Sequence, residues 1–172
     1  MAPAVQKKHR VADSSRDEQF MRLALEQAYA AEKAGEIPVG AVVVLGSEVI
    51  GRGSNSPILR NDPTAHAEIL ALRESALTVG NYRLKESTVY STLEPCVMCA
   101  GAIVAARVRR LVFAARDIRF GAVRSKFSLA DSELLNHRVQ VEEGLLAAEC
   151  GDLVRCFLQR ARQRSSDSGQ QP

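Results

Sequence analysis

The chain has 172 residues, of which 46% are hydrophobic and 25% charged, and its formal net charge is +3. This is the composition of a globular protein, and the length favours a single domain with a hydrophobic core. No run reaches the roughly 18 apolar residues of a membrane-spanning helix, residues 1–10 lack a secretory signal, and the 4 cysteines are too few for a disulfide scaffold. We therefore expect a soluble cytoplasmic protein without membrane contact.

Residues 1–14 contain a basic cluster without apolar periodicity, so we expect a disordered tail there. Order is expected from Ser15, which opens a Ser-Arg-Asp-Glu sequence with the form of a helix capping box. Apolar residues then recur at helical spacing until Gly35. This pattern predicts an amphipathic helix at about 16–34.

A valine-rich segment follows at residues 38–45, and a Gly-Ser turn separates it from a second extended segment at 48–52. The two segments predict a β-hairpin. Residues 53–63 contain Gly, Ser, Asn and Pro, which indicates a loop. The loop ends in a helix-start signal, and a helix is expected from Ala65 to about residue 78.

The second half of the chain alternates between extended and helical segments. We expect a strand at 88–92, a helix at 96–106, a strand at 110–115, an irregular segment at 116–136, a strand at 138–141 and a closing helix at 146–161. Strands that alternate with helices indicate an α/β sheet with helices on its faces. The polar segment 165–172 predicts a second disordered tail, which leaves 15–164 as one domain.

Two short motifs carry the chemistry: His-Ala-Glu at 66–68, and Pro95 followed by Cys96 and Cys99. One imidazole and two thiolates form a ligand set suited to zinc, and three ligands leave the fourth tetrahedral position for water. Cys96 and Cys99 share one face of the first turn of a helix, whose dipole stabilises thiolates. We therefore predict one catalytic zinc ion per subunit, bound by His66, Cys96 and Cys99.

Glu68 lies two residues after His66, so helical geometry puts its side chain on a different side of the helix from the imidazole. For this reason it is not expected to be a fourth ligand. A carboxylate there can still reach the open coordination position, take a proton from water and deliver it to a ring nitrogen and a leaving amine. Glu68 is predicted to be the catalytic acid and base.

The Cys-x-x-Cys spacing has two other interpretations. A dithiol redox pair is expected in a thioredoxin-like context, which this sequence lacks. A purely structural zinc site needs a fourth ligand, and neither His9 nor His137 is an obvious candidate. Cys150 and Cys156 belong to the closing helix and are predicted to be structural.

The order H-x-E followed by P-C-x-x-C resembles the signature of zinc-dependent nucleoside and nucleobase deaminases. The longer strings DPTAHAEILALR, TLEPCVMCAGAI, VFAARD and NHRV are similar to bacterial tRNA-specific adenosine deaminases, and the similarity covers about residues 16–162. This resemblance implies a cytidine-deaminase-like fold, which is a three-layer α/β/α sandwich around a five-stranded mixed sheet. It also implies a homodimer whose active sites lie near the subunit interface.

The same resemblance implies the substrate, an adenosine at the wobble position of a tRNA anticodon stem-loop, and the product, inosine. The base must enter a pocket beside the zinc, which a single-stranded loop allows. By this resemblance, the residues that bind the nucleotide are Ile37, Asn55, Ala67 and Asp117. The sequence alone is equally compatible with Asn55 as a turn residue with local backbone bonds.

Positive charge is concentrated at residues 107–126, where seven cations and one acid give +6, against +3 for the whole chain. The closing helix adds further arginines, and such clusters suit phosphate contacts. We predict that the RNA backbone is bound by Arg116, Arg119, Arg124, Lys126, Arg155, Arg160, Arg162 and Arg164. For any single arginine, a solvated surface or an ion pair is the alternative, and Arg124 and Lys126 depart from the family pattern.

Two other functions share parts of this pattern. A deaminase of a small molecule such as guanine, cytosine or cytidine would use the same zinc chemistry, but it would not need the arginine-rich segment 107–126. A non-catalytic tRNA-binding subunit would retain zinc for folding, but it would have no use for Glu68.

Overall fold

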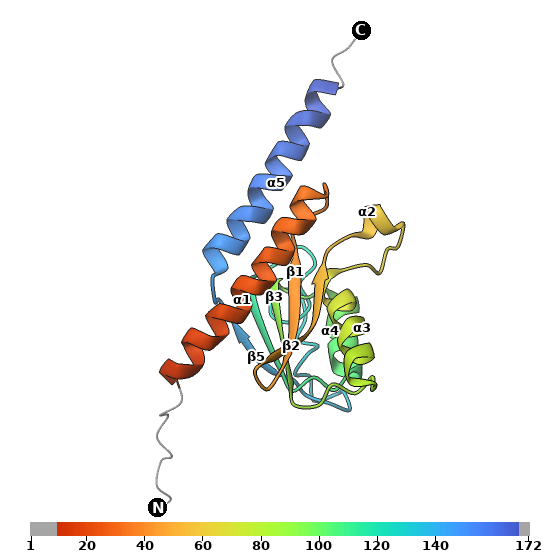
Figure 1. Ribbon diagram of the computed structural model, residues 1–172. Helices are drawn as coiled ribbons and strands as arrows, with labels where there is room; N and C mark the ends of the chain where they lie inside the picture. Colours follow the sequence, from red (N-terminus) through yellow and green to blue (C-terminus); the bar gives the residue numbers. More distant parts are fainter. Residues whose placement is uncertain (1–9, 169–172) are drawn as a thin grey trace, which may run out of the picture.

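One mixed sheet forms the centre of the molecule in the computed structural model, which describes residues 10–168 (Figure 1). The strands are β1 (Gly40–Leu45), β2 (Glu48–Ser54), β3 (Ser87–Leu93), β4 (Arg110–Ala115) and β5 (Gln140–Glu143). Their order across the sheet is β2-β1-β3-β4-β5. β1 is antiparallel to β2 and β3, whereas β3, β4 and β5 run parallel. The expected five-stranded mixed sheet is confirmed.

Helices cover both faces of this sheet. They are α1 (Arg10–Lys33), α2 (Pro57–Arg60), α3 (Ala67–Val79), α4 (Val97–Ala105) and α5 (Ala147–Ser168). α1 and α5 lie side by side on one face, α3 and α4 cover the other, and α2 projects from the loop after β2 (Figure 1). This is the three-layer α/β/α sandwich that was expected. Within residues 10–168, no helix combines the length and apolar character needed to cross a bilayer.

Each face of the sheet has its own hydrophobic core because successive side chains of a strand point to opposite faces. Val42 and Val112 pack with residues of α1 and α5, whereas Val43 and Phe113 pack with residues of α3 and α4. All four side chains are buried. Burial on both faces explains why these strands are continuous apolar runs in the sequence.

Glycine allows α3 to lie very close to β2. A Cβ atom added at Gly53 would stand 1.9 Å from the carbonyl oxygen of Ala67, the first residue of α3. No side chain fits in that space, so only glycine permits the contact. The start of α3 is therefore held directly against the sheet.

The ends of the long helices differ from the sequence-based expectation. α1 starts at Arg10 rather than near residue 16, so residues 10–14 of the expected tail are helical, and residues 1–9 lie outside the described residues. α5 continues to Ser168, into the expected tail 165–172, of which 169–172 lie outside the described residues. Helix propagation adds a backbone hydrogen bond per residue, and neither extension contains Pro or Gly.

Two smaller elements also differ. The expected loop at 53–63 contains the one-turn helix α2, and the last strand occupies Gln140–Glu143 rather than 138–141. Pro57 opens α2, in the first helical position that proline favours. β5 is placed by its pairing with β4, where Arg110 opposes Gln140, and that pairing is a long-range contact that local periodicity does not report.

A charged cluster links α1 to three strands of the sheet. Arg110 of β4 donates to both carboxylate oxygens of Asp17, at 2.8 and 2.6 Å, and the Tyr90 hydroxyl of β3 donates to the same carboxylate at 2.5 Å. Arg110 also binds Glu142 of β5. Although burial raises the pKa of Asp17, the hydrogen bonds from Arg110 and Tyr90 outweigh it and hold that pKa below its usual value.

We predict that Asp17→Asn lowers the free energy of unfolding by about 3 kcal/mol, because it leaves the mostly buried Arg110 guanidinium without its main counter-charge. The matched control is Glu133→Gln, which breaks a pair with Arg138 whose side chains are 82% and 60% exposed. The control is expected to cost less than about 0.5 kcal/mol. Urea unfolding measures both, and equal losses would contradict the assignment.

The Asp17 cluster also predicts a pH dependence. The folded-state pKa of Asp17 lies below the usual 3.8, so its stabilisation is complete above that pH and is lost as pH falls through the folded value. Unfolding measured at a series of pH values is expected to show the wild type and Asp17→Asn converging in stability at the acid end. A difference that stays constant through this acid range would refute the account.

Candidate active site

The three residues predicted to bind metal lie at the starts of two helices. His66 is the residue before α3, and Cys96 is the residue before α4, each in extended backbone conformation. Both are therefore N-caps, one position earlier than the first helical turn in which the sequence places them. Cys99 follows in the first turn of α4. The free N–H groups and the positive dipole ends of α3 and α4 are thus both directed at the site of these three side chains.

The side chains of His66, Cys96 and Cys99 converge. Their ligand atoms all lie within 4.8 Å of one another. Nδ1 of His66 is 3.6 Å from Sγ of Cys96 and 3.5 Å from Sγ of Cys99. One imidazole nitrogen and two sulfur atoms fit the tetrahedral preference of zinc and leave one position open. In the described part of the chain, no other three His, Cys, Asp or Glu residues form such a group.

The charge of the cluster also suits a cation. Hydrogen bonds from Cys99 and His66 lower the pKa of Cys96 to about 4, although burial opposes them. The hydrogen bond to Cys96, together with burial, raises the pKa of Cys99, and the bond to Cys96 raises that of His66. The cluster thus holds a thiolate at neutral pH, and a divalent ion that bound both sulfur atoms would release a proton from Cys99.

Glu68 lies beside this cluster and outside it. It belongs to the first turn of α3 and is 3% exposed. Its Oε2 is 3.5 Å from the Cys99 sulfur, and its Oε1 is 3.4 Å from the Ser91 hydroxyl. Burial raises the pKa of Glu68, against the opposing effects of its backbone hydrogen bond and of His66. A carboxyl group in this position can hold or release a proton next to the metal site.

The residues expected to hold the base are brought close together. Asn55 is buried, and its side-chain amide donates to the Ile37 carbonyl at 3.2 Å. The next residue, Ser56, donates its N–H to the carbonyl of Ala65, directly before His66. Ile37 remains 43% exposed. The side-chain bond of Asn55 thus reaches a carbonyl 18 residues away, unlike the local bond of a turn residue, and Asn55 also stands next to the metal-binding segment.

Ala67 and Asp117 occupy different places in the site. Ala67 is fully buried at the start of α3, directly after His66 in the chain. Asp117 is partly buried, and its Oδ1 accepts the N–H groups of Arg119 at 2.9 Å and Phe120 at 3.2 Å. This carboxylate caps its own loop, which borders the segment that contains Cys96.

Ion pairs occupy half of the residues predicted to contact the RNA backbone. The pairs are Arg116 with Glu143, Arg124 with Asp131, Arg155 with Asp152, and Arg160 with Glu32. Arg119 instead packs its guanidinium over the Phe120 ring, and among the described residues neither Arg119 nor Lys126 has an acidic partner. Arg162 and Arg164 lie on the exposed surface of α5. The alternative interpretation as ion pairs therefore holds for at least these four of the eight.

Two buried acids near the site are absent from the sequence-based prediction. Glu36 is 1% exposed and accepts the Leu59 N–H at 2.7 Å, which ties α2 to the segment that carries Ile37. Glu94, at 3% exposed, precedes the Pro95-Cys96 segment. The one sequence signal for a buried acid was a glutamate beside apolar residues. That signal is weak, because burial of a charged side chain depends on long-range contacts that cannot be predicted from the local sequence.

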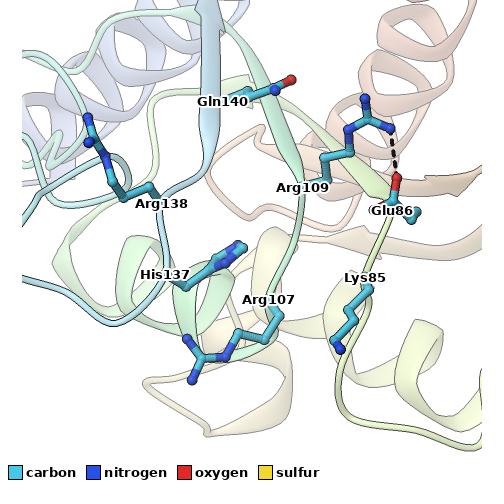
Figure 2. A pocket seen from close by; sticks show the side chains of 7 residues that line it. All are labelled: Lys85, Glu86, Arg107, Arg109, His137, Arg138 and Gln140. Carbon is cyan, nitrogen blue, oxygen red and sulfur yellow. Dashed lines mark hydrogen bonds and ion pairs between the residues drawn. The ribbon is translucent and has the colours of Figure 1, made fainter.

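A cavity of about 280 Å³ lies at the end of the sheet where β3, β4 and β5 begin, away from the metal cluster (Figure 2). Polar side chains from the segments that lead into β3, β4 and β5 line it, namely Lys85, Glu86, Arg107, Arg109, His137, Arg138 and Gln140. Arg109 pairs with Glu86 at 2.7 Å, and Arg107 donates to Asn136. Since β3 runs from this cavity to the metal cluster, the cavity is not part of the candidate active site.

Comparisons with known proteins agree with this geometry. Residues 14–115, which include the metal cluster and Glu68, match the family model of the cytidine and deoxycytidylate deaminase zinc-binding region. The chain is 52% identical to the tRNA-specific adenosine deaminase of Haemophilus influenzae over 148 residues, which are 86% of each chain. It therefore shares both the zinc-binding region and most of its length with a characterised deaminase family.

Solved structures of deaminases share the fold of this chain. A tRNA:A34 deaminase of A-to-I editing at the wobble position superposes with a TM-score of 0.76 and 42% identity, over 78% of this chain and 98% of the other. A guanine deaminase from Nitrosomonas europaea superposes with a TM-score of 0.71 and 26% identity, over 91% and 97% of the two chains. The fold is thus common to enzymes that act on a tRNA and on a free base.

We predict that Cys99→Ala abolishes zinc binding, because only one imidazole and one thiol remain. Metal analysis of the purified protein is expected to fall from about one zinc per chain to near zero, and the melting temperature is expected to fall with it. Cys156→Ser is the matched control, since Cys156 is an exposed free thiol, and it should retain full zinc. Undiminished zinc in Cys99→Ala would refute the ligand assignment.

Proposed function

This chain belongs to the cytidine and deoxycytidylate deaminase zinc-binding family, among the tRNA-specific adenosine deaminases, and we propose that it converts the wobble adenosine of a tRNA anticodon to inosine. In this hydrolysis a water oxygen bonds to C6 of the base, the bond from C6 to its amino nitrogen breaks, and ammonia leaves. One observation carries the proposal: a buried carboxylate, Glu68, lies beside a three-donor metal cluster without belonging to it.

Zinc is the cofactor of this family, and the donor set of the chain suits it. We assign its three protein ligands to His66, Cys96 and Cys99. When bound, zinc supplies the Lewis acidity that makes water a nucleophile at neutral pH. The two helix N-termini stabilise the negative charge of the thiolates, so the protein favours the ionised form of its own ligands.

In this proposal Glu68 moves the protons. Its carboxylate takes one proton from the attacking water and delivers it to the ring nitrogen N1. It then takes the second proton of that water from the new hydroxyl on C6 and gives it to the departing amine, so that the carboxylate is regenerated. Burial, which raises the pKa of Glu68, favours its holding a proton between these steps. Besides the hydrogen bond to its own backbone, its carboxylate makes only the long side-chain contacts to Ser91 and Cys99, at 3.4 and 3.5 Å, so proton transfer does not require the loss of a strong side-chain hydrogen bond.

Four residues are proposed to hold the nucleotide. The exposed part of Ile37 offers an apolar surface for the purine, and Asn55 next to it supplies polar atoms for the base or ribose. Ala67 is a small residue at the start of α3, where its lack of a long side chain leaves room for the base. Asp117 stands on the loop that borders the other side of the metal-binding segment.

RNA binding is proposed to depend first on Arg119 and Lys126, which have no acidic partner among the described residues and belong to the loop beside Cys96. Arg162 and Arg164 are proposed to add a second basic surface on α5, whose C-terminal half projects beyond the sheet (Figure 1). The four arginines in ion pairs would have to give up a carboxylate to bind a phosphate. They are therefore expected to contribute less.

We also propose that the protein is a homodimer of the cytoplasm. Ile58 and Leu59 of α2 are 72% and 71% exposed, and adjacent exposed apolar side chains of this size are typical of contact surfaces. All four cysteines are free thiols, as a reducing compartment favours. Sedimentation analysis of wild type and of Ile58→Ser with Leu59→Ser measures the mass, and the variant is expected to be monomeric.

The decisive assay is inosine formation on an anticodon stem-loop with a wobble adenosine, beside free adenosine, cytidine and guanine. Glu68→Ala is expected to retain zinc and to lose a factor on the order of 10²–10⁴ in turnover, because the general acid and base is removed. Near-normal activity of this variant would contradict the assignment of Glu68. Reaction of a free base without reaction of the stem-loop would show that the substrate class is wrong.

We predict that Arg119→Ala with Lys126→Ala weakens stem-loop binding and reduces the slope of log Kd against log salt by about 1–2, since each phosphate contact contributes about one unit. The matched control is Lys85→Ala with Arg109→Ala, which removes the same charge at the opposite end of the sheet (Figure 2). Binding titrations at several salt concentrations compare the two. Equal slopes in both double variants would argue against a specific RNA surface at the loop.

A further inference from the structure

Glu94 is a buried acid at the junction between the sheet and the metal-binding segment. It follows β3, precedes Pro95 and Cys96, and is 3% exposed. Its N–H donates to the carbonyl of Ala115 at the end of β4, at 2.8 Å. A buried charge destabilises a fold unless it is well hydrogen-bonded, so the partners of its carboxylate indicate its role.

Those partners come from a single loop. Oε1 of Glu94 accepts the backbone N–H groups of Val123 at 3.0 Å, Arg124 at 2.6 Å and Ser125 at 2.8 Å. Oε2 accepts the backbone N–H of Asp117 at 3.1 Å and the hydroxyl of Ser125. One carboxylate therefore organises a loop that has neither a helix nor a strand to satisfy these donors.

The same loop is attached to the metal-binding segment. Gly121 forms a β-bridge with Cys96, and the N–H of Ala122 donates to the Pro95 carbonyl at 2.8 Å. A Cβ atom at Gly121 would lie 2.3 Å from the carboxyl group of Glu94, so the loop packs directly on it. The three consecutive residues 94–96 therefore connect two parts of the site. Cys96 is a proposed metal ligand, and Glu94 and Pro95 accept hydrogen bonds from the loop.

We propose that Glu94 is a positioning residue of the deamination, whose carboxylate holds the loop that carries Asp117 in register with Cys96. The inference rests on the proposed function and deepens it. The carboxylate of Glu94 bonds to none of the three metal donor atoms; it acts through the backbone of the loop. Since displacement of a bound group by about 1 Å can cost a factor of 10² in rate, loosening this loop is expected to slow the chemistry.

Glu94→Gln tests the proposal because it retains the shape of the side chain. The amide has one acceptor oxygen, and its NH2 group faces backbone N–H donors, so part of the hydrogen-bond set is lost. Ser125→Ala is a milder second variant that removes one hydroxyl donor and leaves the four backbone bonds. Asp17→Asn is the matched control, since it breaks a comparable carboxylate cluster that joins α1 to Arg110, the first residue of β4.

For each variant we would measure zinc content, melting temperature, stem-loop Kd and single-turnover rate, at a temperature well below every melting transition. Glu94→Gln is expected to retain zinc and to lose rate by a factor on the order of 10², and Ser125→Ala by a factor on the order of five. Asp17→Asn is expected to lose stability and to retain its rate within about twofold, because its cluster is remote from the site.

A purely structural role makes the opposite prediction. If Glu94→Gln loses only stability, as Asp17→Asn does, or if its rate falls only in proportion to lost zinc, the positioning role is overturned. If Glu94→Gln does not fold, an unchanged rate in Ser125→Ala overturns it equally. Should the wild type deaminate free guanine and not the stem-loop, the proposed function fails, and the same variants test the positioning role on guanine.

Discussion

The first turns of α3 and α4 meet at the C-terminal end of β3, and the chemistry of the protein depends on this contact. Only residues 94–96 separate the end of β3 from the start of α4. The helix starts there because β3 and β4 are parallel, so the connection between them must leave from the C-terminal end of β3. α3 reaches the same place because Gly53 allows it to lie directly on β2. Two positive helix ends thereby face the sulfur atoms and the imidazole.

Three glutamates at this end of the molecule are almost completely buried, and their hydrogen bonds distinguish their roles. Glu36, Glu68 and Glu94 are 1%, 3% and 3% exposed. The carboxylate of Glu94 has five donors and is held as a structural anion, whereas Glu36 accepts a short bond from a backbone N–H of α2. Besides the hydrogen bond to its own backbone, Glu68 has only long side-chain contacts, at 3.4 and 3.5 Å. The acid with the weakest side-chain bonds is therefore the one proposed to exchange protons.

The loop after β4 offers fewer unpaired cations than its net charge implies. Arg116 and Arg124 are neutralised by Glu143 and Asp131, whereas Arg119 rests on an aromatic ring. Pairing of this kind orders the loop and leaves fewer cations for a polyanion. The surface proposed for RNA is therefore small, and it adjoins the loop whose backbone is held by a buried carboxylate.

Local patterns in the sequence were enough to predict the hairpin, the bounds of β4, the three candidate metal ligands and the acid that follows His66. Periodicity, turn chemistry and motif spacing act within a few residues, so they can be read without a fold. Tertiary contacts were needed to show that Glu94 binds a loop 23 to 31 residues away, that four of the arginines predicted to bind RNA are in ion pairs, and that the two cysteines lie beside the imidazole. Such contacts arise when sheet register and helix packing bring distant segments together, and neither is encoded in the local pattern.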